Sequence, residues 1–373
     1  MGGIMADKLR VLQVTGSLRI GGLENVALNI FRFCDRNNYS FDYLVYGDAV
    51  EPLEEEVQNL GGRVFHIPYP HNGMMTYFRE MKKIMRECGP YDVVHSHSLF
   101  NSGFVMLAAA QMKIPVRISH AHSDRRNTKT KLPRKIYNSC MQFLINRYST
   151  VRFACSEGAG RYLYGSGFGE DVRLVKNGID TEKFRPNKNL RQKIRKEFGF
   201  EENKIVLHVG RLAEVKNQKK VIDVFHHVCR ADPSVRLLIA GDGELKEALQ
   251  SQIDALGLDS AAILTGTRSD IPALLSAADA YIMPSLYEGV SLSLIEAQVS
   301  GIPCLVSSNA AAAETRLTDC LHILELTDSD EVWAKHLLGL LERSRVPDAA
   351  VQVIEKGYDL SDIIKNVLQF YGE

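Results

Sequence analysis

Two glutamates that stand eight residues apart form the most informative pair of candidate functional residues in this sequence. Glu288 and Glu296 lie in the segment YEGVSLSLIEA, which follows the apolar run AYIMPS and continues into a helix-like run. A glycine-containing turn between a strand and a helix leaves backbone N–H groups pointing outward, and these favour an anion. A carboxylate near the first turns of the helix can accept hydrogen bonds from vicinal hydroxyls. The segment therefore predicts a phosphate beside a polyol, the combination that a nucleotide offers.

A pair of cations stands in the segment HVGRLAEVKNQ. Gly210 and Arg211 follow an apolar run, and Lys216 comes five residues after Arg211, at an expected helix start. Arginine supplies a planar fork and lysine a point charge, and both suit a diphosphate. Cations at such junctions are often simply exposed to solvent. Because features that favour phosphate recur at several junctions, we favour the binding interpretation.

Four histidines stand in two pairs at the ends of consecutive apolar runs. His95 and His97 end one run, and His120 and His122 end the next. Since parallel strands present their carboxyl ends at one edge of a sheet, we expect these four side chains to lie close together. A single histidine is more often structural, but the repetition favours a role in a site. We expect no metal, because no carboxylate or thiol stands nearby as a further ligand.

Two other motifs carry weaker signals. The turn TGSLRIGG places Gly16, Gly21 and Gly22 between the first strand and the first helix, where backbone can approach a ligand closely. It matches neither GxGxxG nor GxxxxGK[ST], so tight packing and ligand contact both stay open.

The triplet DSD at 328–330 would suit a metal-held diphosphate. A helical pattern follows it, so helix capping is favoured.

Length and composition limit the class of protein. With 373 residues, the chain suits two domains of roughly 180 residues each. The formal net charge is zero, so we expect no nucleic-acid partner. The 7 cysteines have no metal-ligand spacing, which indicates reduced thiols and a cytoplasmic location. The first residues, MGGIMADKLRVLQV, resemble neither a signal peptide nor a membrane span.

Short apolar runs alternate with longer amphipathic stretches, which predicts βαβ units and parallel sheets. The expected strands are 10–14, 41–46, 63–67, 93–97, 116–119, 152–155, 172–175, 205–209, 235–240, 262–264, 280–283 and 304–306. Turn-forming residues cluster in NGIDTEKFRPN at 177–187, between the two sets of strands. We therefore predict an α/β protein with two doubly wound, Rossmann-like domains, 1–180 and 187–356, facing each other across a cleft.

Basic residues concentrate at 117–152, where nine Lys or Arg accompany one acid. Within this stretch Ile136, Cys140, Leu144 and Tyr148 recur every four residues, which predicts a helix with an apolar stripe. We expect the stripe to face the core, with the basic side chains in solvent. The alternative is a surface that meets anionic lipid head groups or a phosphate-bearing acceptor.

Together these motifs resemble the retaining glycosyltransferases of the GT-B fold, specifically glycosyltransferase family 4. The similarity spans almost the whole chain. It includes GGLEN, DVVHSHS, VRISHAHSD, KNGIDTEKFRP, VGRLAEVKNQ, LLIAGDGEL, LTGTRSDIPALLSAAD and YEGVSLSLIEAQVSGIPCL. The most specific feature is the Arg-x4-Lys pair followed by the Glu-x7-Glu pair, with NGID before both. Bacterial exopolysaccharide and capsule enzymes, with their RIxHxH pattern, are the most similar subgroup.

The resemblance implies a role for each matching residue of the second domain. Arg211 and Lys216 match the pair that binds the diphosphate of a nucleotide sugar. Glu296 matches the residue that binds the ribose hydroxyls, and Glu288 matches the residue that faces the transferred sugar. Arg268 stands where the family contacts the nucleobase.

The loop between the two glutamates departs from the family pattern. The resemblance implies that Gly289, Val290 and Ser291 donate backbone N–H groups to sugar and phosphate. Many members read EGFGxPxxE, whereas this chain reads EGVSLSLIE, so Ser291 replaces a common glycine. The shape of the loop and the donor preference are therefore expected to differ.

For the first domain, the resemblance implies a contact of Gly22 with the diphosphate. It also implies an active-site histidine, for which we favour His122 over His120. His97 and His120 are candidates on the acceptor side. A C-terminal helix within 359–373 is expected to pack back on this domain.

The implied activity is transfer of a hexose-type sugar from a nucleoside diphosphate sugar, a UDP-sugar first, to an acceptor hydroxyl with retention of configuration. No cofactor or metal is implied. The expected acceptor is a glycan or lipid-linked glycan in bacterial polysaccharide assembly, at the inner face of the cytoplasmic membrane. Residues 117–152 would make the peripheral contact. A nucleotide-sugar epimerase of the same fold and a non-catalytic nucleotide-sugar-binding protein stay open as alternatives.

Overall fold

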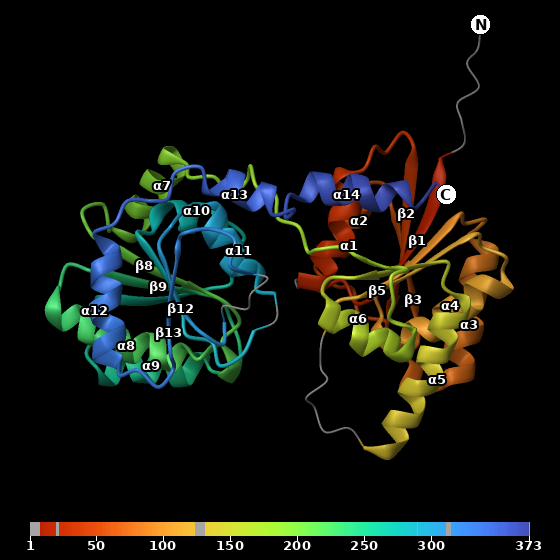
Figure 1. Ribbon diagram of the computed structural model, residues 1–373, viewed down its shortest axis with the longest axis horizontal. Helices are drawn as coiled ribbons and strands as arrows, with labels where there is room; N and C mark the ends of the chain where they lie inside the picture. The colour runs from red at the N-terminus through yellow and green to blue at the C-terminus, as the bar shows by residue number, and fades with distance from the viewer. Residues whose placement is uncertain (1–7, 20–21, 124–130, 289, 311–314, 373) are drawn as a thin grey trace, which may run out of the picture. The chain divides into compact units, whose positions relative to one another are not determined.

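The structure is a computed structural model that describes residues 8–19, 22–123, 131–288, 290–310 and 315–372. The chain divides into two compact units. Unit 1 contains Met1–Gly178 and Leu360–Glu373, and unit 2 contains Ile179–Asp359. Each unit is built on one parallel β-sheet with helices on both faces (Figure 1). The predicted α/β class with two doubly wound sheets is therefore confirmed.

The sheet of unit 1 has seven strands in the order β3-β2-β1-β4-β5-β6-β7. The strands are β1 (Leu9–Gly16), β2 (Tyr39–Tyr46), β3 (Arg63–Ile67), β4 (Val93–Ser96), β5 (Val116–Ala121), β6 (Val151–Ala154) and β7 (Val172–Leu174). The strand order reverses between β1 and β4. In doubly wound sheets ligands bind at the carboxyl ends of the strands beside this switch point.

Helices cover both faces of this sheet because both faces of its strands are apolar. Val11 and Phe41 face a cluster shared with α1 (Gly22–Phe33), α2 (Glu54–Asn59) and α14 (Leu360–Gln369). Leu12 and Leu44 face the opposite cluster, with α3 (Met74–Glu87) and α4 (Ser102–Gln111). A third cluster packs α5 (Leu132–Tyr148) and α6 (Glu157–Tyr164) beside β5 and β6. The sheet is thus the middle layer of three.

The sheet of unit 2 has six strands in the order β10-β9-β8-β11-β12-β13, with its switch point between β8 and β11. The strands are β8 (Ile205–Val209), β9 (Arg236–Ala240), β10 (Ala262–Gly266), β11 (Ala280–Met283), β12 (Cys304–Ser307) and β13 (Leu321–Leu324). The helices are α7 (Lys188–Phe198), α8 (Gln218–Ala231), α9 (Lys246–Ala255), α10 (Ile271–Ala277), α11 (Leu292–Val299), α12 (Asp330–Leu341) and α13 (Ala349–Glu355).

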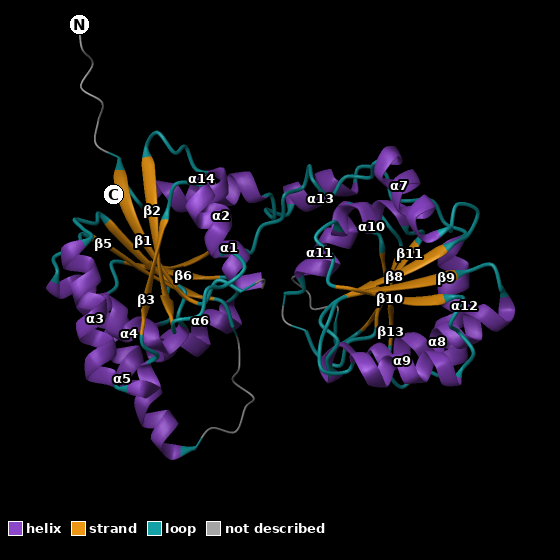
Figure 2. Ribbon diagram, turned by 180° about the vertical axis from the view of Figure 1, so that it is seen from behind, coloured by secondary structure: helices purple, strands orange, loops and turns teal. Residues whose placement is uncertain are grey.

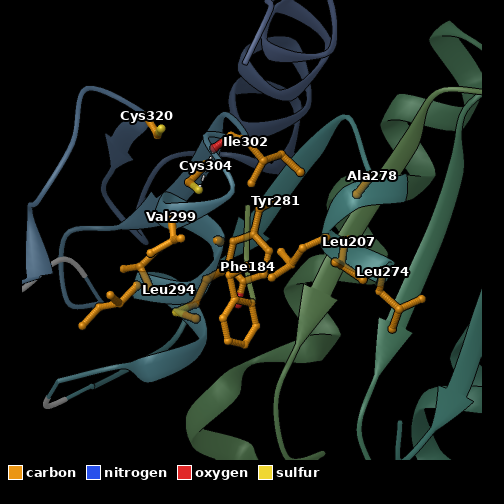
Figure 3. Close-up of a cluster of buried hydrophobic side chains, with 14 of the residues drawn as sticks. Phe184, Leu207, Leu274, Ala278, Tyr281, Leu294, Val299, Ile302, Cys304 and Cys320 are labelled. Carbon is orange, nitrogen blue, oxygen red and sulfur yellow. Dashed lines mark hydrogen bonds between the residues drawn. The ribbon is translucent and has the colours of Figure 1, made fainter. Parts of the chain in front are cut away.

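The two faces of the unit 2 sheet pack on different sets of helices. One cluster places Leu207 and Tyr281 against residues of α7, α10, α11 and α13, and Figure 3 shows Tyr281 surrounded by Leu207, Phe184 and neighbouring apolar side chains. The other cluster joins the opposite face to α8, α9 and α12. Alternate residues of one strand therefore hold the helices of both layers.

The apolar stripe predicted within 117–152 is wrong in part. Ile136 is 58% exposed and Cys140 is also exposed, whereas Met141 and Ile145 are the buried residues of α5. Apolar side chains lie on two adjacent rows of this helix, and the packing against α4 selects the other row. The exposed row keeps Leu132, Ile136 and Phe143 in solvent. Residues 124–130 of the basic stretch lie outside the described residues.

The last helix, α14, returns the chain to unit 1. Ile179 and Asp359 form a parallel bridge within unit 2, so the outgoing and returning chains run side by side. Ile364 and Val367 join the cluster that contains residues of α1. Figure 2 shows α14 beside α1 and α2. Tyr371 is 1% exposed, and its hydroxyl lies 2.8 Å from His95 Nδ1 and accepts from Gln13 Nε2 at 3.1 Å.

Replacing Tyr371 by Phe removes a hydroxyl that two buried polar side chains share. We expect the change to lower the free energy of unfolding by about 1–3 kcal/mol, because Gln13 and His95 lose a partner while they stay buried. Tyr371→Ala should cost about 3–5 kcal/mol, since it also leaves a cavity. Chemical denaturation followed by circular dichroism measures both. The exposed Lys365→Ala on α14, the helix just before Tyr371, is the control, and a Tyr371→Phe variant as stable as this control would contradict the expectation.

Candidate functional site

The carboxyl ends of β8 and β11 bring Lys216 and Glu288 together in unit 2. Lys216 Nζ lies 2.7 Å from Glu288 Oε1, and the two side chains are only 17% and 12% exposed. The contact has the distance of an ion pair without the alignment of a hydrogen bond. One residue from each predicted pair thus meets at the switch point, although 72 positions separate them in the sequence.

Backbone contacts between two loops fix this meeting. Asn217 adopts a left-handed conformation, with φ of 55°, between the short 3-10 helix Glu214–Lys216 and α8. Its side-chain Nδ2 donates to the carbonyl of Pro284 at 3.0 Å, and the amide of Leu286 donates to the carbonyl of Val215 at 2.9 Å. Asparagine tolerates this conformation better than most residues. The two loops are therefore joined on both sides of Lys216.

Glycines let the loops after β8 and β9 approach each other and make room for Lys216. A Cβ on Gly210 would lie 3.4 Å from Cδ and Cε of Lys216. A Cβ on Gly241 would lie 2.0 Å from the carbonyl oxygen of Gly210, so no other residue fits there without displacing backbone. Arg211, directly after Gly210, is exposed and extends from this packed loop.

Two buried side chains that sequence reasoning missed support the same loop. His208 donates from Nδ1 to the carbonyl of Ile282 at 2.9 Å and accepts from Gln218 at Nε2 at 3.2 Å. Gln218 also donates to the carbonyl of Arg211 at 2.8 Å. Burial lowers the pKa of His208 to about 4, so the ring is neutral and can accept. The pattern HVGR, with a polar ring inside an apolar strand, was the available signal.

Glu296 lies in the second turn of α11. Burial raises the pKa of its carboxyl to about 7, and the nearby Lys183 opposes this shift. Glu296 is half-buried, and an ionised carboxylate withdrawn from water is costly unless donors satisfy it; its two oxygens can accept several hydrogen bonds. Glu296 therefore suits a ligand that brings hydroxyl groups.

The loop before Glu296 is described on both sides of residue 289. Val290 packs against the apolar cluster of α11, and Ser291 is buried as the residue that precedes the helix. The hydroxyl of Ser291 lies 3.3 Å from that of Ser293. Gly289 lies outside the described residues, so its predicted contact stays a prediction.

Arg268 is already held by two carboxylates. Its Nε donates to Asp270 Oδ1 at 2.8 Å, and its Nη1 donates to Glu197 Oε1 at 2.7 Å. The guanidinium also lies over the ring of Phe198, 5.7 Å from its centroid. The contact of Arg268 with a nucleobase stays a prediction.

The four histidines of unit 1 lie together at the ends of β4 and β5, as their spacing predicts. His95 Nε2 is 3.2 Å from His120 Nδ1, and His97 Nδ1 is 2.7 Å from His122 Nε2. His95, His97 and His120 are at most 2% exposed, whereas His122 is partly exposed. Burial lowers the pKa of all four, to about 4 for His122, so the rings are neutral.

One row of hydrogen bonds connects these rings to Gln13 and Tyr371. The Gln13 side chain accepts from His97 Nε2 at 2.9 Å and donates to Tyr371, so the orientation of its amide sets the direction of the row. Each member then donates to the next in the order His122, His97, Gln13, Tyr371, His95 and His120. Neutral His122 thereby keeps its proton on Nε2 and a lone pair on Nδ1.

The burial of the rings bears on the other predictions for unit 1. Ring nitrogens of His95, His97 and His120 lie within 4.8 Å of one another, as in a metal site, but both nitrogens of His95 and His97 are used in the row. The absence of a metal stays a prediction.

His97 and His120 are covered in unit 1, so any effect on an acceptor would pass through their neighbours. Gly22 is the first residue of α1.

The DSD triplet acts at a helix start. Ser329 accepts from the amide of Val332 as the N-cap of α12, and Asp330 pairs with Lys220 at 2.8 Å. The capping interpretation of this triplet is confirmed, with the serine as the cap.

Comparison with known proteins places the two units in one family. The model of glycosyl transferases group 1 matches residues 191–358, and the model of Glycosyltransferase Family 4 matches residues 20–183. The putative glycosyltransferase EpsF of Bacillus subtilis is 31% identical over 376 residues, which cover 98% of this chain and 97% of EpsF. A UDP-Gal:alpha-D-GlcNAc-diphosphoundecaprenol alpha-1,3-galactosyltransferase of Escherichia coli is 26% identical over 81% of this chain and 80% of its own length.

Solved structures agree on the fold. The structure of HepE from Anabaena in complex with UDP superposes with a TM-score of 0.79, covers 98% of this chain and 100% of its own, and is 19% identical. WaaG, a glycosyltransferase involved in lipopolysaccharide biosynthesis, reaches a TM-score of 0.70 at 16% identity, over 97% and 99% of the two chains. The chain thus belongs to glycosyltransferase family 4, the group 1 glycosyltransferases of the GT-B fold, which transfer sugars from nucleotide sugars.

Proposed function

We propose that this protein is a retaining hexosyltransferase that moves a sugar from a UDP-sugar to an acceptor hydroxyl in exopolysaccharide assembly. The observation that carries the proposal is the meeting of Lys216 and Glu288 at the switch point of unit 2, where Arg211 follows β8 and Glu296 lies in the helix that follows β11. Support for UDP comes from HepE, whose structure contains it, and support for exopolysaccharide comes from EpsF.

Each residue has a role that its surroundings favour. Arg211 and Lys216 bind the diphosphate, because both place a cation at the carboxyl end of β8. Glu296 accepts the two ribose hydroxyls, and Glu288 faces the transferred sugar. Before the donor binds, Glu288 neutralises Lys216, so the incoming phosphate takes over a cation that is already held in place.

The proposed reaction proceeds on one face of the sugar. The bond from the anomeric carbon to the β-phosphate oxygen breaks while the acceptor oxygen approaches from the same side. The departing phosphate accepts the proton of the acceptor hydroxyl, and Arg211 and Lys216 stabilise its negative charge. These two cations perform the task that a metal ion performs elsewhere, so we propose a metal-independent enzyme. Positioning and charge stabilisation supply most of the acceleration.

Unit 1 contributes His122 to this proposal. The ring is neutral, and the hydrogen-bond row holds it with Nδ1 as an acceptor. Nδ1 is buried and Asn177 is its neighbour, so a hydroxyl of the transferred sugar that donates to this nitrogen takes the place of Asn177. His95, His97, Gln13 and Tyr371 then position His122 rather than contact the sugar.

We further propose a lipid-linked acceptor at the cytoplasmic face of the membrane. The E. coli relative acts on a diphosphoundecaprenol-linked sugar. In the described part of the chain no helix has the length and apolar character for crossing a bilayer. Instead, the exposed row of α5 combines Leu132, Ile136 and Phe143 with exposed Lys131 and Lys135. Apolar side chains beside cations are typical of helices that lie on anionic membranes.

Replacing Lys216 by Ala should reduce sugar transfer on the order of 10²–10³-fold, because one stabilising charge on the leaving phosphate is lost. Release of UDP from UDP-sugars in the presence of a membrane extract as acceptor source measures turnover. The exposed Lys219→Ala, three residues away, is the matched control and should keep full activity. Near-full turnover of a folded Lys216→Ala variant would contradict the proposal. UDP released only with acceptor indicates transfer, and an altered nucleotide sugar indicates an epimerase. If neither product forms, the protein only binds nucleotide sugars.

Nucleotide affinity should depend on pH through Glu296. Its pKa is raised to about 7, and only the ionised carboxylate accepts both ribose hydroxyls without losing a lone pair. The ionised fraction, and with it the affinity for UDP, should therefore fall about tenfold from pH 8 to pH 6. Calorimetric titration at several pH values measures this dependence. UDP itself titrates in this range, so Glu296→Gln is the control. A wild-type profile with the same slope as Glu296→Gln would contradict the role of Glu296.

Membrane contact should depend on the exposed row of α5. Ile136→Ser with Phe143→Ser should weaken binding to vesicles that contain anionic lipid, because both side chains lose apolar burial. Vesicle co-sedimentation with and without phosphatidylglycerol measures the binding. Leu174→Ser, at a residue of β7 that is 54% exposed, is the control. Equal and negligible binding of the wild type to both vesicles would remove the membrane proposal.

A further inference from the structure

An aromatic cavity of about 440 Å³ opens in unit 1 at the carboxyl-end side of β2 and β3. Its lining side chains come from four separate loops or helices. They include Tyr46, Tyr69, His71, Asn101, Arg134 and Tyr137. A cavity of this size, with aromatic walls and a few polar groups, has the features of a small-molecule site.

The aromatic walls are held by their surroundings. The rings of Tyr46 and Tyr69 meet edge to face at 6.3 Å between centroids, and Tyr69 stacks on His71 at 5.1 Å. A Cβ on Gly47 would lie 2.7 Å from the ring of Tyr69, so this glycine allows the ring to lie against the backbone. The hydroxyl of Tyr46 is 2.9 Å from that of Tyr77. The walls are therefore preformed rather than free to rotate.

Polar groups gather at the α5 side of the cavity. The hydroxyl of Tyr137 donates to Asn101 Oδ1 at 2.6 Å, which leaves the two amide hydrogens of Asn101 as donors. The guanidinium of Arg134 lies 5.1 Å from the centroid of the Tyr137 ring and is exposed. Among the residues that the structure describes, the lining contains one permanent cation and no carboxylate. A ligand is thus expected to combine a ring that packs on aromatic faces, hydroxyls and one anionic group.

We propose that this cavity binds the sugar residue of the acceptor, with the phosphate linked to that sugar directed toward Arg134. The inference rests on the proposed function and extends it to the second substrate. A pyranose has an apolar C–H face for the rings of Tyr46 and Tyr69 and equatorial hydroxyls for Asn101 and the tyrosine hydroxyls. A phosphate next to it pairs with the planar fork of arginine.

The surroundings of the cavity favour an acceptor with a lipid tail. Met74 lines the cavity and is 49% exposed, and its neighbour Met75 is 81% exposed. Leu132 stands two residues before Arg134 at the start of α5 and is 70% exposed. Exposed apolar side chains on two elements that contribute to the cavity suit a ligand whose sugar is linked through phosphate to lipid.

The test uses N-acetylglucosamine 1-phosphate and free N-acetylglucosamine as probes, in saturation-transfer NMR titrations with excess UDP in the donor site. The phosphorylated sugar should bind the wild type about tenfold more tightly, because a charge-assisted pair is worth roughly 1.4 kcal/mol. Arg134→Gln should abolish this preference. Tyr69→Ala should weaken both probes by a similar factor. Arg147→Gln, on the same helix and over Tyr148, is the matched control and should bind as the wild type does.

The outcomes separate this inference from the proposed function. Unchanged binding of both probes by folded Tyr69→Ala and Arg134→Gln variants would overturn the cavity as the acceptor site. If only Lys216→Ala abolishes binding of the probes, they bind in the donor site, and the assignment of the cavity as the acceptor site is also overturned. Loss of activity in Lys216→Ala, with probe binding kept, is the result expected when both proposals hold. Tyr137→Phe, which keeps the ring, should weaken the probes less than Tyr69→Ala and guards against a folding defect.

Discussion

The ion pair between Lys216 and Glu288 is the contact on which the site of unit 2 depends. A buried charge is tolerated when an opposite charge lies within reach, and here neither partner is left alone. The pair requires the loops after β8 and β11 to touch, which in turn requires the left-handed Asn217 and the carbonyl contact to Pro284. The glycines at 210 and 241 leave the space into which Lys216 folds. One electrostatic contact thereby explains several special residues.

In unit 1 the polar side chains are ordered by hydrogen bonds between neutral groups, and not by an ion pair. Its histidines carry no charge, and their order comes from hydrogen bonds in one direction, with Gln13 and Tyr371 between them. The two units thus prepare their sites in complementary ways. Unit 2 holds a half-buried ion pair at its switch point, whereas unit 1 holds neutral rings in fixed orientations.

The sequence alone predicted those helices and strands whose own residue pattern determines their structure. Continuous apolar runs such as Ala280–Met283 identified the strands, because both faces of a parallel sheet are covered. β13 was missed, since its four residues LHIL are short and only half buried. The row of α5 was misassigned because Ile136 and Met141 both continue apolar spacings, and only contact with α4 decides between them. The distance from Lys216 to Glu288 depends on two loops, and periodicity contains no information about it.

The return of the chain through α14 has a consequence for the order of events during synthesis. Unit 2 is contiguous in the sequence, whereas unit 1 is interrupted by it and resumes at Leu360, in the segment that contains Tyr371. Chains emerge from the ribosome from the N-terminus, and domains fold as units once their residues are available. The unit that begins first is therefore completed last. Until Tyr371 emerges, Gln13 and His95 have no shared partner, so all residues of unit 2 are available to the nascent protein before the hydrogen-bond row of unit 1 is complete.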